Sequence, residues 1–299
     1  MRFDNQRMQA ESFATEHSVP AVFVSHGAPT LALDTGPARS FLAGLGRTLG
    51  RPRAIVVVSA HWEADEVRVG AAARPATIHD FFGFPAPLYE LRYPAPGAAD
   101  LAGEIVELLT AAGYGAALDY ERGLDHGAWV PLSLMYPDAD IPVLQVSINP
   151  ARSPAHHWRL GRALCALRAS GVLVLGSGSM THNLQDFRRQ RHAVDAPVET
   201  YAEEFSEWFA AHLADGDLDA LLAYRERAPA AGRAHPTDEH LLPLYVALGA
   251  AGVSWSAERV HHGFMHGAIA MDCYLFRSVR AQASTTDFNH TNLGETHAF

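Results

Sequence analysis

Hydrophobic residues follow two alternating patterns along the chain. Short runs that are apolar at consecutive positions cover residues 19–24, 54–59, 141–148 and 172–175. Such runs are typical of strands buried on both faces of a parallel sheet. Longer segments with apolar residues three or four positions apart, which is helical spacing, cover residues 37–49, 101–112 and 155–169. The alternation predicts an α/β fold in which a mainly parallel central sheet is flanked by helices.

Weaker patterns predict the remaining elements. The helices are expected at residues 198–213, 218–224 and 237–248, and the strands at 67–72, 114–120, 253–259 and 267–276. Thr237 is the expected N-cap of the last helix. Residues 1–18 and 281–299 are polar and aperiodic, so we expect a flexible N-terminal arm, one domain over residues 19–280 and a C-terminal tail.

Composition restricts the possible partners. Hydrophobic residues make up 48% of the chain and charged residues 19%, which is the balance of a packed soluble domain. The net charge of −10 argues against nucleic acid or an anionic membrane as a partner, because both require concentrated Lys and Arg. No apolar run is long enough for a membrane helix, and the N-terminal segment lacks a signal-peptide pattern. Cys165 and Cys273 provide neither a disulfide framework nor a Cys-based zinc site, so we expect a cytoplasmic protein.

Three of the 17 histidines follow predicted strands. His26, His61 and His182 each lie just past a buried run, and in open α/β sheets ligands bind at the carboxyl ends of the strands. Three imidazoles, joined by Glu239 or His240 from the helix expected after Thr237, favour a divalent transition metal. Any one of these histidines alone is more often a polar residue bonded to a backbone carbonyl, but three at equivalent positions weaken that interpretation.

Other polar motifs do not favour a site. His156 and His157 are expected to face solvent, and the pair His262 and His266 lacks the Glu of a zinc-protease motif. The Gly-Ser-Gly sequence at 176–178 lacks the third glycine of a dinucleotide-binding loop, so a nicotinamide cofactor is not expected. The serines of this stretch also do not fit the nucleophile pattern of serine hydrolases.

Several ordered motifs resemble the 4,5-DOPA extradiol dioxygenase family of class III, LigB-like ring-opening enzymes. The matching segments are SHGAP at 25–29, SAHW at 59–62, TIHDFFGFP at 77–85, YPAPG at 93–97, DHGAW at 125–129, MYPDADIPV at 135–143 and PTDEHLLPL at 236–244. The resemblance extends from about residue 19 to about residue 276. It implies a non-haem Fe(II) enzyme that opens a substituted, DOPA-like catechol with O₂. It also implies that Zn(II) can replace the iron in purified protein.

The resemblance also implies roles for individual residues. His26, His61 and His240 would be metal ligands, and His182 would be the acid/base residue and a possible fourth ligand. His126, on the loop expected around Asp-His-Gly, would contact oxygen or substrate. The third ligand stays open between Glu239 and His240, because neighbouring residues of a helix diverge by about 100° and only one can face the site.

The aromatic, proline-rich segment 77–97 is expected to cover a pocket. The expected wall of this pocket consists of Trp62, Phe81, Phe82, Phe84 and Tyr89, among which Trp62 and Phe82 are the candidate substrate contacts. His79 is a further candidate, which would bind a polar substituent or hold the covering segment in place. Two alternatives to the dioxygenase stay open: a Memo-type binding module without turnover, and a zinc hydrolase. The sequence does not decide between a monomer and a small homo-oligomer.

Overall fold

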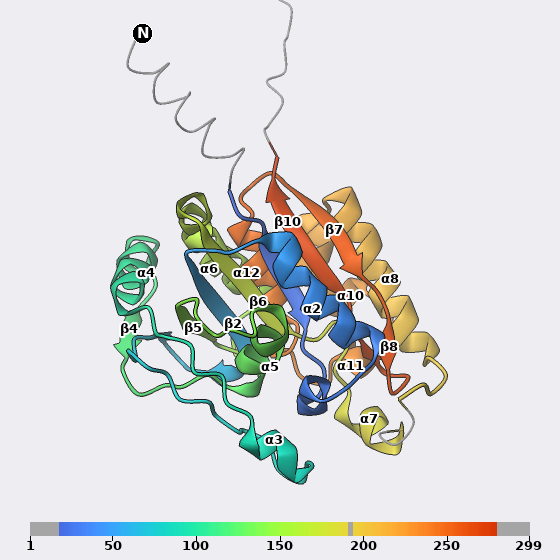
Figure 1. Ribbon diagram of the computed structural model, residues 1–299. Coiled ribbons are helices and arrows are strands. Elements are labelled where there is room, and N and C mark those ends of the chain that lie inside the picture. The colour runs from blue at the N-terminus through green and yellow to red at the C-terminus, as the bar shows by residue number, and fades with distance from the viewer. Residues whose placement is uncertain (1–17, 191–193, 280–299) are drawn as a thin grey trace, which may run out of the picture.

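The computed structural model describes residues 18–190 and 194–279, and a central sheet lies between two layers of helices (Figure 1). In this part of the chain the main sheet has eight strands in the order β4-β3-β5-β2-β6-β1-β10-β7. The strands are β1 (Ala21–Ser25), β2 (Ala54–Glu63), β3 (Val67–Gly70), β4 (Ala116–Asp119), β5 (Val143–Ile148), β6 (Val172–Gly178), β7 (Trp255–His261) and β10 (Cys273–Ser278). A separate hairpin consists of β8 (Phe264–Met265) and β9 (Ile269–Ala270).

The central strands β5, β2, β6 and β1 are parallel to one another. The edges are mixed, because β10 runs antiparallel to both β1 and β7, and β3 runs antiparallel to β5 while pairing in parallel with β4. The predicted α/β fold with a mainly parallel sheet is therefore confirmed. Residues 1–17 of the expected arm and the expected tail at 281–299 lie outside the described residues.

Helices cover both faces of the sheet. The longer ones are α2 (Pro37–Leu49), α4 (Ala99–Ala111), α5 (His126–Met135), α6 (Pro154–Leu164), α8 (Thr200–Asp215) and α12 (Leu242–Ala250). The shorter ones are η1 (Pro29–Ala32), α3 (Ala86–Glu90), η2 (Cys165–Ser170), α7 (Leu184–Gln190), α9 (Leu218–Leu222), α10 (Tyr224–Arg227) and α11 (Ala231–Ala234). Among the described residues, no helix has both the length and the apolar character needed to cross a membrane.

Alternate residues of each central strand pack into two separate cores, because successive side chains of a strand point to opposite faces. On β2, Ile55 and Val57 join the core beneath α2 and α5, whereas Val56 and Val58 join the core beneath α4, α6, α8 and α12. This two-sided burial accounts for the continuous apolar runs that predicted the strands. It also fixes the carboxyl ends of β1, β2 and β6 side by side.

Three local predictions were wrong. The last helix begins at Leu242, not at Thr237, and Pro243 lies in its first turn, where the missing N–H costs no helical hydrogen bond. Asp-His-Gly is not a loop: Asp125 caps α5 by accepting a hydrogen bond from the backbone N–H of Ala128, so His126 begins the helix. His157 does not face solvent but is fully buried, and both of its ring nitrogens are satisfied there: one donates to the carbonyl of Ser153 and the other accepts from the N–H of Asn149.

Candidate metal centre

The carboxyl ends of β1, β2 and β6 open onto one cavity. These strands are adjacent in the sheet; His26 directly follows β1, His61 lies near the end of β2, and His182 follows β6. The cavity has a volume of about 690 Å³, and its lining includes His26, His61, His126, His182 and His240. The structure thus brings together every histidine that the sequence placed at the metal or in catalysis.

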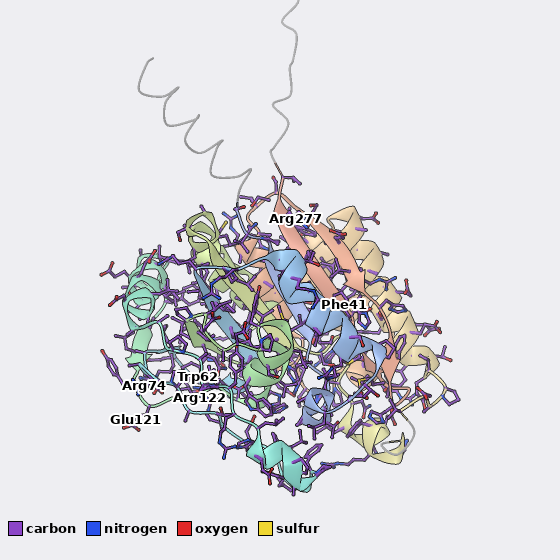
Figure 2. All side chains as sticks on the ribbon, viewed as in Figure 1. Phe41, Trp62, Arg74, Glu121, Arg122 and Arg277 are labelled. Carbon is purple, nitrogen blue, oxygen red and sulfur yellow. The ribbon has the colours of Figure 1, made fainter. Side chains whose placement is uncertain are left out.

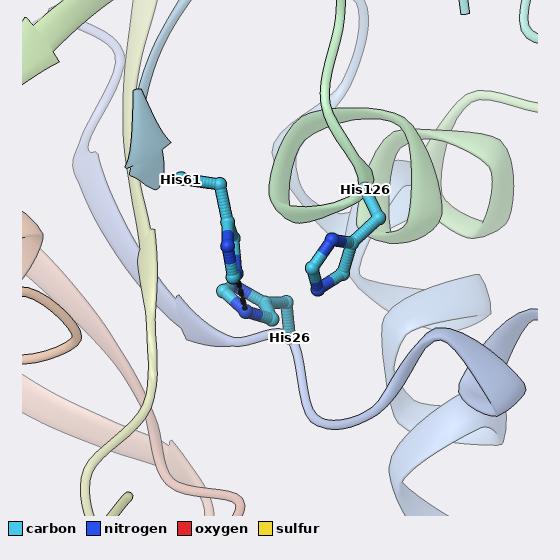
Figure 3. Close-up of side chains that lie close together, drawn as sticks. All are labelled: His26, His61 and His126. Atoms are coloured by element: carbon cyan, nitrogen blue, oxygen red, sulfur yellow. Dashed lines mark hydrogen bonds between the residues drawn. The ribbon is translucent and has the colours of Figure 1, made fainter. Parts of the chain in front are cut away.

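His26 and His61 approach each other through their Nε2 atoms, which are 3.1 Å apart (Figure 3). The Ser177 hydroxyl donates to the carbonyl of Gly127 and accepts from Nδ1 of His26 at 3.0 Å. This arrangement selects the Nδ1–H tautomer of His26 and leaves its Nε2 lone pair free. Two nitrogens bound at right angles to one ion, each about 2.1 Å from it, are about 3 Å apart. The observed separation therefore fits two ligands of a shared metal.

His126 completes a buried group of three histidines, which we call the sheet-edge group: His26, His61 and His126. Asp80 accepts hydrogen bonds from both Nδ1 and the backbone N–H of His126, each at 2.9 Å. The ring of His126 lies 3.9 Å from that of His61, centroid to centroid. Candidate ligand atoms of the three residues all lie within 4.8 Å of one another, so this donor set is compatible with one metal ion.

A second set of donors, the loop group, consists of His182, Glu239 and His240. Their candidate ligand atoms also lie within 4.8 Å of one another. His182 stacks on His240 with ring centroids 3.4 Å apart, and Nδ1 of His240 lies 3.0 Å from Oε1 of Glu239. The rings of His61 and His240 are 4.9 Å apart, so the two groups adjoin.

Both Glu239 and His240 line the cavity, contrary to the prediction that only one of them faces it. The helical divergence on which that prediction relied does not apply, because residues 236–241 form turns before α12 begins. Either residue can therefore supply the third metal ligand, and experiment must decide between them.

Glycines in β6 bring His240 to the site. A Cβ atom on Gly178 would lie 2.0 Å from the carbonyl oxygen of His240, and one on Gly176 would lie 2.2 Å from that of Pro243. The backbone N–H of Ser179 donates to the same His240 carbonyl at 2.9 Å. The glycines that resembled part of a dinucleotide loop thus allow close backbone packing.

A buried carboxylate supports the opposite side of the cavity. Asp125 is fully buried and accepts hydrogen bonds from the Ser59 hydroxyl at 2.7 Å and from Arg122 and Gln145 at 2.8 Å each. Arg122 also donates to the carbonyl of His61 at 3.1 Å. Asp125 therefore connects β2, β5 and the start of α5, the elements that position His61 and His126.

Burial keeps most of the site histidines neutral. It lowers the pKa of His61 to about 4 and that of His182 to about 3, with neighbouring histidines contributing in the same direction. The pKa values of His26 and His240 also lie well below the ordinary value, chiefly because of burial. Burial opposes ionisation of Asp80, but its hydrogen bonds and proximity to His126 lower its pKa to about 2. Neutral imidazoles are the form that binds metal.

The predicted pocket wall is partly corrected. Trp62, Phe81 and Phe84 line the cavity, whereas Phe82, which is 91% exposed, and Tyr89 do not. The turn around Gly83, which has a positive φ of 75°, directs the intervening Phe82 side chain outward. His79 does not line the cavity: its Nε2 lies 3.1 Å from the carbonyl of Leu91, so it holds the covering segment in place.

Sequence reasoning missed Asp80, Asp125 and Arg122. An acidic residue directly beside a histidine, in His79-Asp80 and Asp125-His126, was the available signal, because carboxylates commonly orient histidines at metal sites. Two histidines outside the cavity have partners of their own, and one of them, His262, lies 2.7 Å from the buried carboxylate of Asp272. His235 donates from Nε2 to the carbonyl of Met180 at 2.8 Å.

Comparison with known proteins shows the family to which the chain belongs. The family model described as the catalytic LigB subunit of aromatic ring-opening dioxygenase matches residues 20–276. The chain is 43% identical over 260 residues to the 4,5-DOPA dioxygenase extradiol of Beta vulgaris, covering 86% of this chain and 96% of that protein. It is also 43% identical over 236 residues to the protein of that name from Escherichia coli K12, covering 78% of this chain and 85% of that protein.

A solved structure shows the same fold. A crystal structure of an uncharacterized Escherichia coli K12 protein superimposes with a TM-score of 0.71 at 36% identity, covering 86% of this chain and 99% of that one. The match to the family model covers nearly the whole described chain and includes all the cavity histidines. The chain therefore belongs to the LigB family and is an extradiol aromatic ring-opening dioxygenase.

Proposed function

We propose that this protein is an Fe(II)-dependent dioxygenase that opens a substituted, DOPA-like catechol with O₂. The observation that carries the proposal is the 3.1 Å approach of the His26 and His61 Nε2 atoms at the base of a cavity with an aromatic wall. The names of the relatives, among them 4,5-DOPA dioxygenase extradiol, support the choice of substrate. A cytoplasmic location is also part of the proposal, because Cys165 and Cys273 are both free, as is usual in a reducing compartment.

The metal ligands in this proposal are His26, His61 and a third group from the loop group, with His240 preferred over Glu239. An Fe(II) ion bound there would hold the two catechol oxygens and allow electrons to pass from the ring to O₂. Zn(II) suits the same nitrogen donors and would occupy the site in purified protein. His182 is close enough to His240 to serve as a fourth ligand when substrate is absent.

His182 is the proposed acid/base residue. Because burial lowers its pKa to about 3, the imidazole is neutral but is a weak proton acceptor in the substrate-free cavity. The negative charge of a bound catecholate raises the pKa of a neighbouring imidazole. Proton transfer from the second phenol to His182 is thus coupled to substrate binding.

His126 is the proposed second proton-handling residue. Asp80 holds its Nδ1–H, which leaves Nε2 facing the other histidines of the sheet-edge group. If Nε2 accepts a proton, the Asp80 carboxylate stabilises the resulting imidazolium at 2.9 Å. His126 can therefore receive a proton and return it to oxygen during ring opening.

Apolar side chains complete the cavity and limit the access of water. Phe81 and Phe84 come from the covering segment, and Leu184 and Phe187 come from α7 on another side. A flat aromatic ring fits between such groups, and their low polarity strengthens the electrostatic interactions of the reacting oxygens.

Oxygen uptake by the reconstituted protein tests this function. The protein is loaded anaerobically with Fe(II), mixed with a panel of catechols and exposed to O₂; uptake and a yellow ring-opened semialdehyde are expected. Absence of uptake with every catechol would refute the proposal. Metal binding without turnover would instead favour a binding module of the Memo type, and ester or amide cleavage with zinc alone would favour a hydrolase.

A further inference from the structure

One carboxylate of the cavity has no role in the proposed chemistry. Asp80 is bonded to His126, and Glu239 is bonded to His240 and to the Thr237 hydroxyl. Glu63, the last residue of β2, also lines the cavity, but its carboxylate forms no hydrogen bond or ion pair with any residue that the structure describes. A carboxylate without a partner at the wall of a binding cavity is available to a ligand.

The surroundings of Glu63 do not neutralise its charge. The nearby cation, Arg122, lies over the Trp62 ring at 5.2 Å, and Figure 2 shows the two side by side. The charge of Arg122 is already compensated, because its guanidinium donates to the buried Asp125 at 2.8 Å. Glu239 lines the same cavity, so its carboxylate adds a second negative charge to the space that Glu63 faces.

We propose that Glu63 is a specificity-determining residue that binds a positively charged ammonium group on the side chain of the aromatic diol. The proposal rests on the function proposed above, because it assumes that the diol lies at the histidines. Glu63 follows His61 by two residues, past the point where the pairing of β2 with β5 becomes irregular, and both residues line the cavity. The side chain of a diol held at the histidines therefore lies in the same cavity as the Glu63 carboxylate.

Charge explains why this residue selects among catechols. An ammonium group gains an ion pair with Glu63, whereas a carboxylate in the same place meets the negative charges of Glu63 and Glu239. Because Glu63 is exposed at the rim, water screens the ion pair, and pairs of this kind change affinity by up to about fivefold. The preference therefore concerns the substituent and leaves binding of the diol itself unchanged.

The test compares two catechols of similar size, dopamine and 3,4-dihydroxyphenylpropionate, which carry opposite charges. Their dissociation constants are measured by calorimetric titration of the zinc-loaded protein under argon, so that no turnover is required. The variant is Glu63→Gln, and the matched control is Glu66→Gln, which removes an equal charge three residues away at an exposed position outside this cavity.

We expect Glu63→Gln to weaken dopamine binding about fivefold while leaving dihydroxyphenylpropionate binding unchanged or tighter. Glu66→Gln should change neither. An equal effect of Glu63→Gln on both ligands, or no effect, overturns the proposal even if the Fe(II) enzyme opens catechols. If the wild-type preference for dopamine exists and Glu63→Gln removes it, the proposal stands even if oxygen uptake fails. If neither ligand binds, this proposal is wrong, and oxygen uptake across the catechol panel decides the proposed function separately.

Discussion

The sheet-edge group and the loop group bring similar donors to one cavity by different physical means. In the sheet-edge group, side-chain hydrogen bonds hold the rings: Ser177 fixes His26, and Asp80 fixes His126. In the loop group, backbone packing sets the positions, since the His240 carbonyl rests against Gly178 and the His182 N–H bonds to the carbonyl of Ala234. One half of the site therefore depends on particular polar partners, and the other half on the close approach of two backbones.

The largest expected effect follows from the sheet-edge group. Replacing His61 with Ala removes a donor whose Nε2 lies 3.1 Å from that of His26. Loss of a residue that hydrogen-bonds a metal ligand already lowers metal affinity by about 10–100-fold, so loss of the ligand itself should lower metal affinity by more than about 100-fold. We expect purified His61→Ala and His26→Ala proteins to contain almost no metal by elemental analysis.

His182→Ala is the comparison for this experiment. It should retain most of the metal and lose turnover, because His182 is proposed to handle protons and not to be an obligatory ligand. Full metal content in the His61 variant would contradict the assignment of the sheet-edge group as the base of the metal site.

The next effect concerns the third ligand. If His240 is the ligand, His240→Ala should lose metal nearly as completely as His61→Ala. Glu239→Gln should then cost only about tenfold in metal affinity, because Glu239 acts through its hydrogen bond to Nδ1 of His240. Titration of both variants with Zn(II) against a competing chelator measures this difference, and the reverse order would make Glu239 the ligand.

A third prediction separates backbone packing from ligand chemistry. Gly178→Ala adds a methyl group that would lie 2.0 Å from the His240 carbonyl oxygen, so β6 and the turn before α12 must move apart. Overpacking of this kind costs about 1–3 kcal/mol. We expect a lower unfolding midpoint in urea together with weaker metal binding.

Gly103→Ala is the matched control for this substitution. Gly103 lies within α4, and an added Cβ there would have no neighbour within 4 Å. Alanine should stabilise this helix by about 0.5–1 kcal/mol and leave metal binding unchanged. If Gly178→Ala behaves like Gly103→Ala, close packing is not what places the loop group.

The same contrast explains what could be predicted from the sequence. Apolar runs buried on both faces indicated β1, β2 and β6, so the hydrophobic pattern alone was enough to place His26, His61 and His182 at one sheet edge. The approach of His240 to this edge could not be derived in this way. Its geometry depends on contacts between Gly178 and His240, which are far apart in the chain. Proton partners such as Asp80 were missed for a similar reason, because the fold brings residue 80 to residue 126.

Acid titration of the metal-free protein gives the smallest expected effect. Burial lowers the pKa of His182 from 6.5 to about 3, so the unfolded chain binds a proton at this residue in a range where the folded chain does not. Its contribution to stability is therefore fully present above pH 6.5 and is lost as pH falls toward about 3. The free energy of unfolding therefore falls by about 1.4 kcal/mol for each pH unit in this range. We expect His182→Asn to reduce the slope of unfolding free energy between pH 6 and pH 5 by about this amount.

His262→Asn is the control for the acid titration, because its imidazole responds in the opposite sense. The hydrogen bond to Asp272 raises the pKa of His262, so both the folded and the unfolded chain carry that proton below pH 6.5. The substitution should leave the slope of the unfolding free energy between pH 6 and pH 5 unchanged.

The two groups differ in how far carboxylates counteract burial. Asp80 and Asp125 partly offset the effect of burial on the pKa of His61, which falls only to about 4, whereas no carboxylate offsets the effect of burial on the pKa of His182 to the same extent. Equal slopes for His182→Asn and wild type would show that the loop group is open to water in solution.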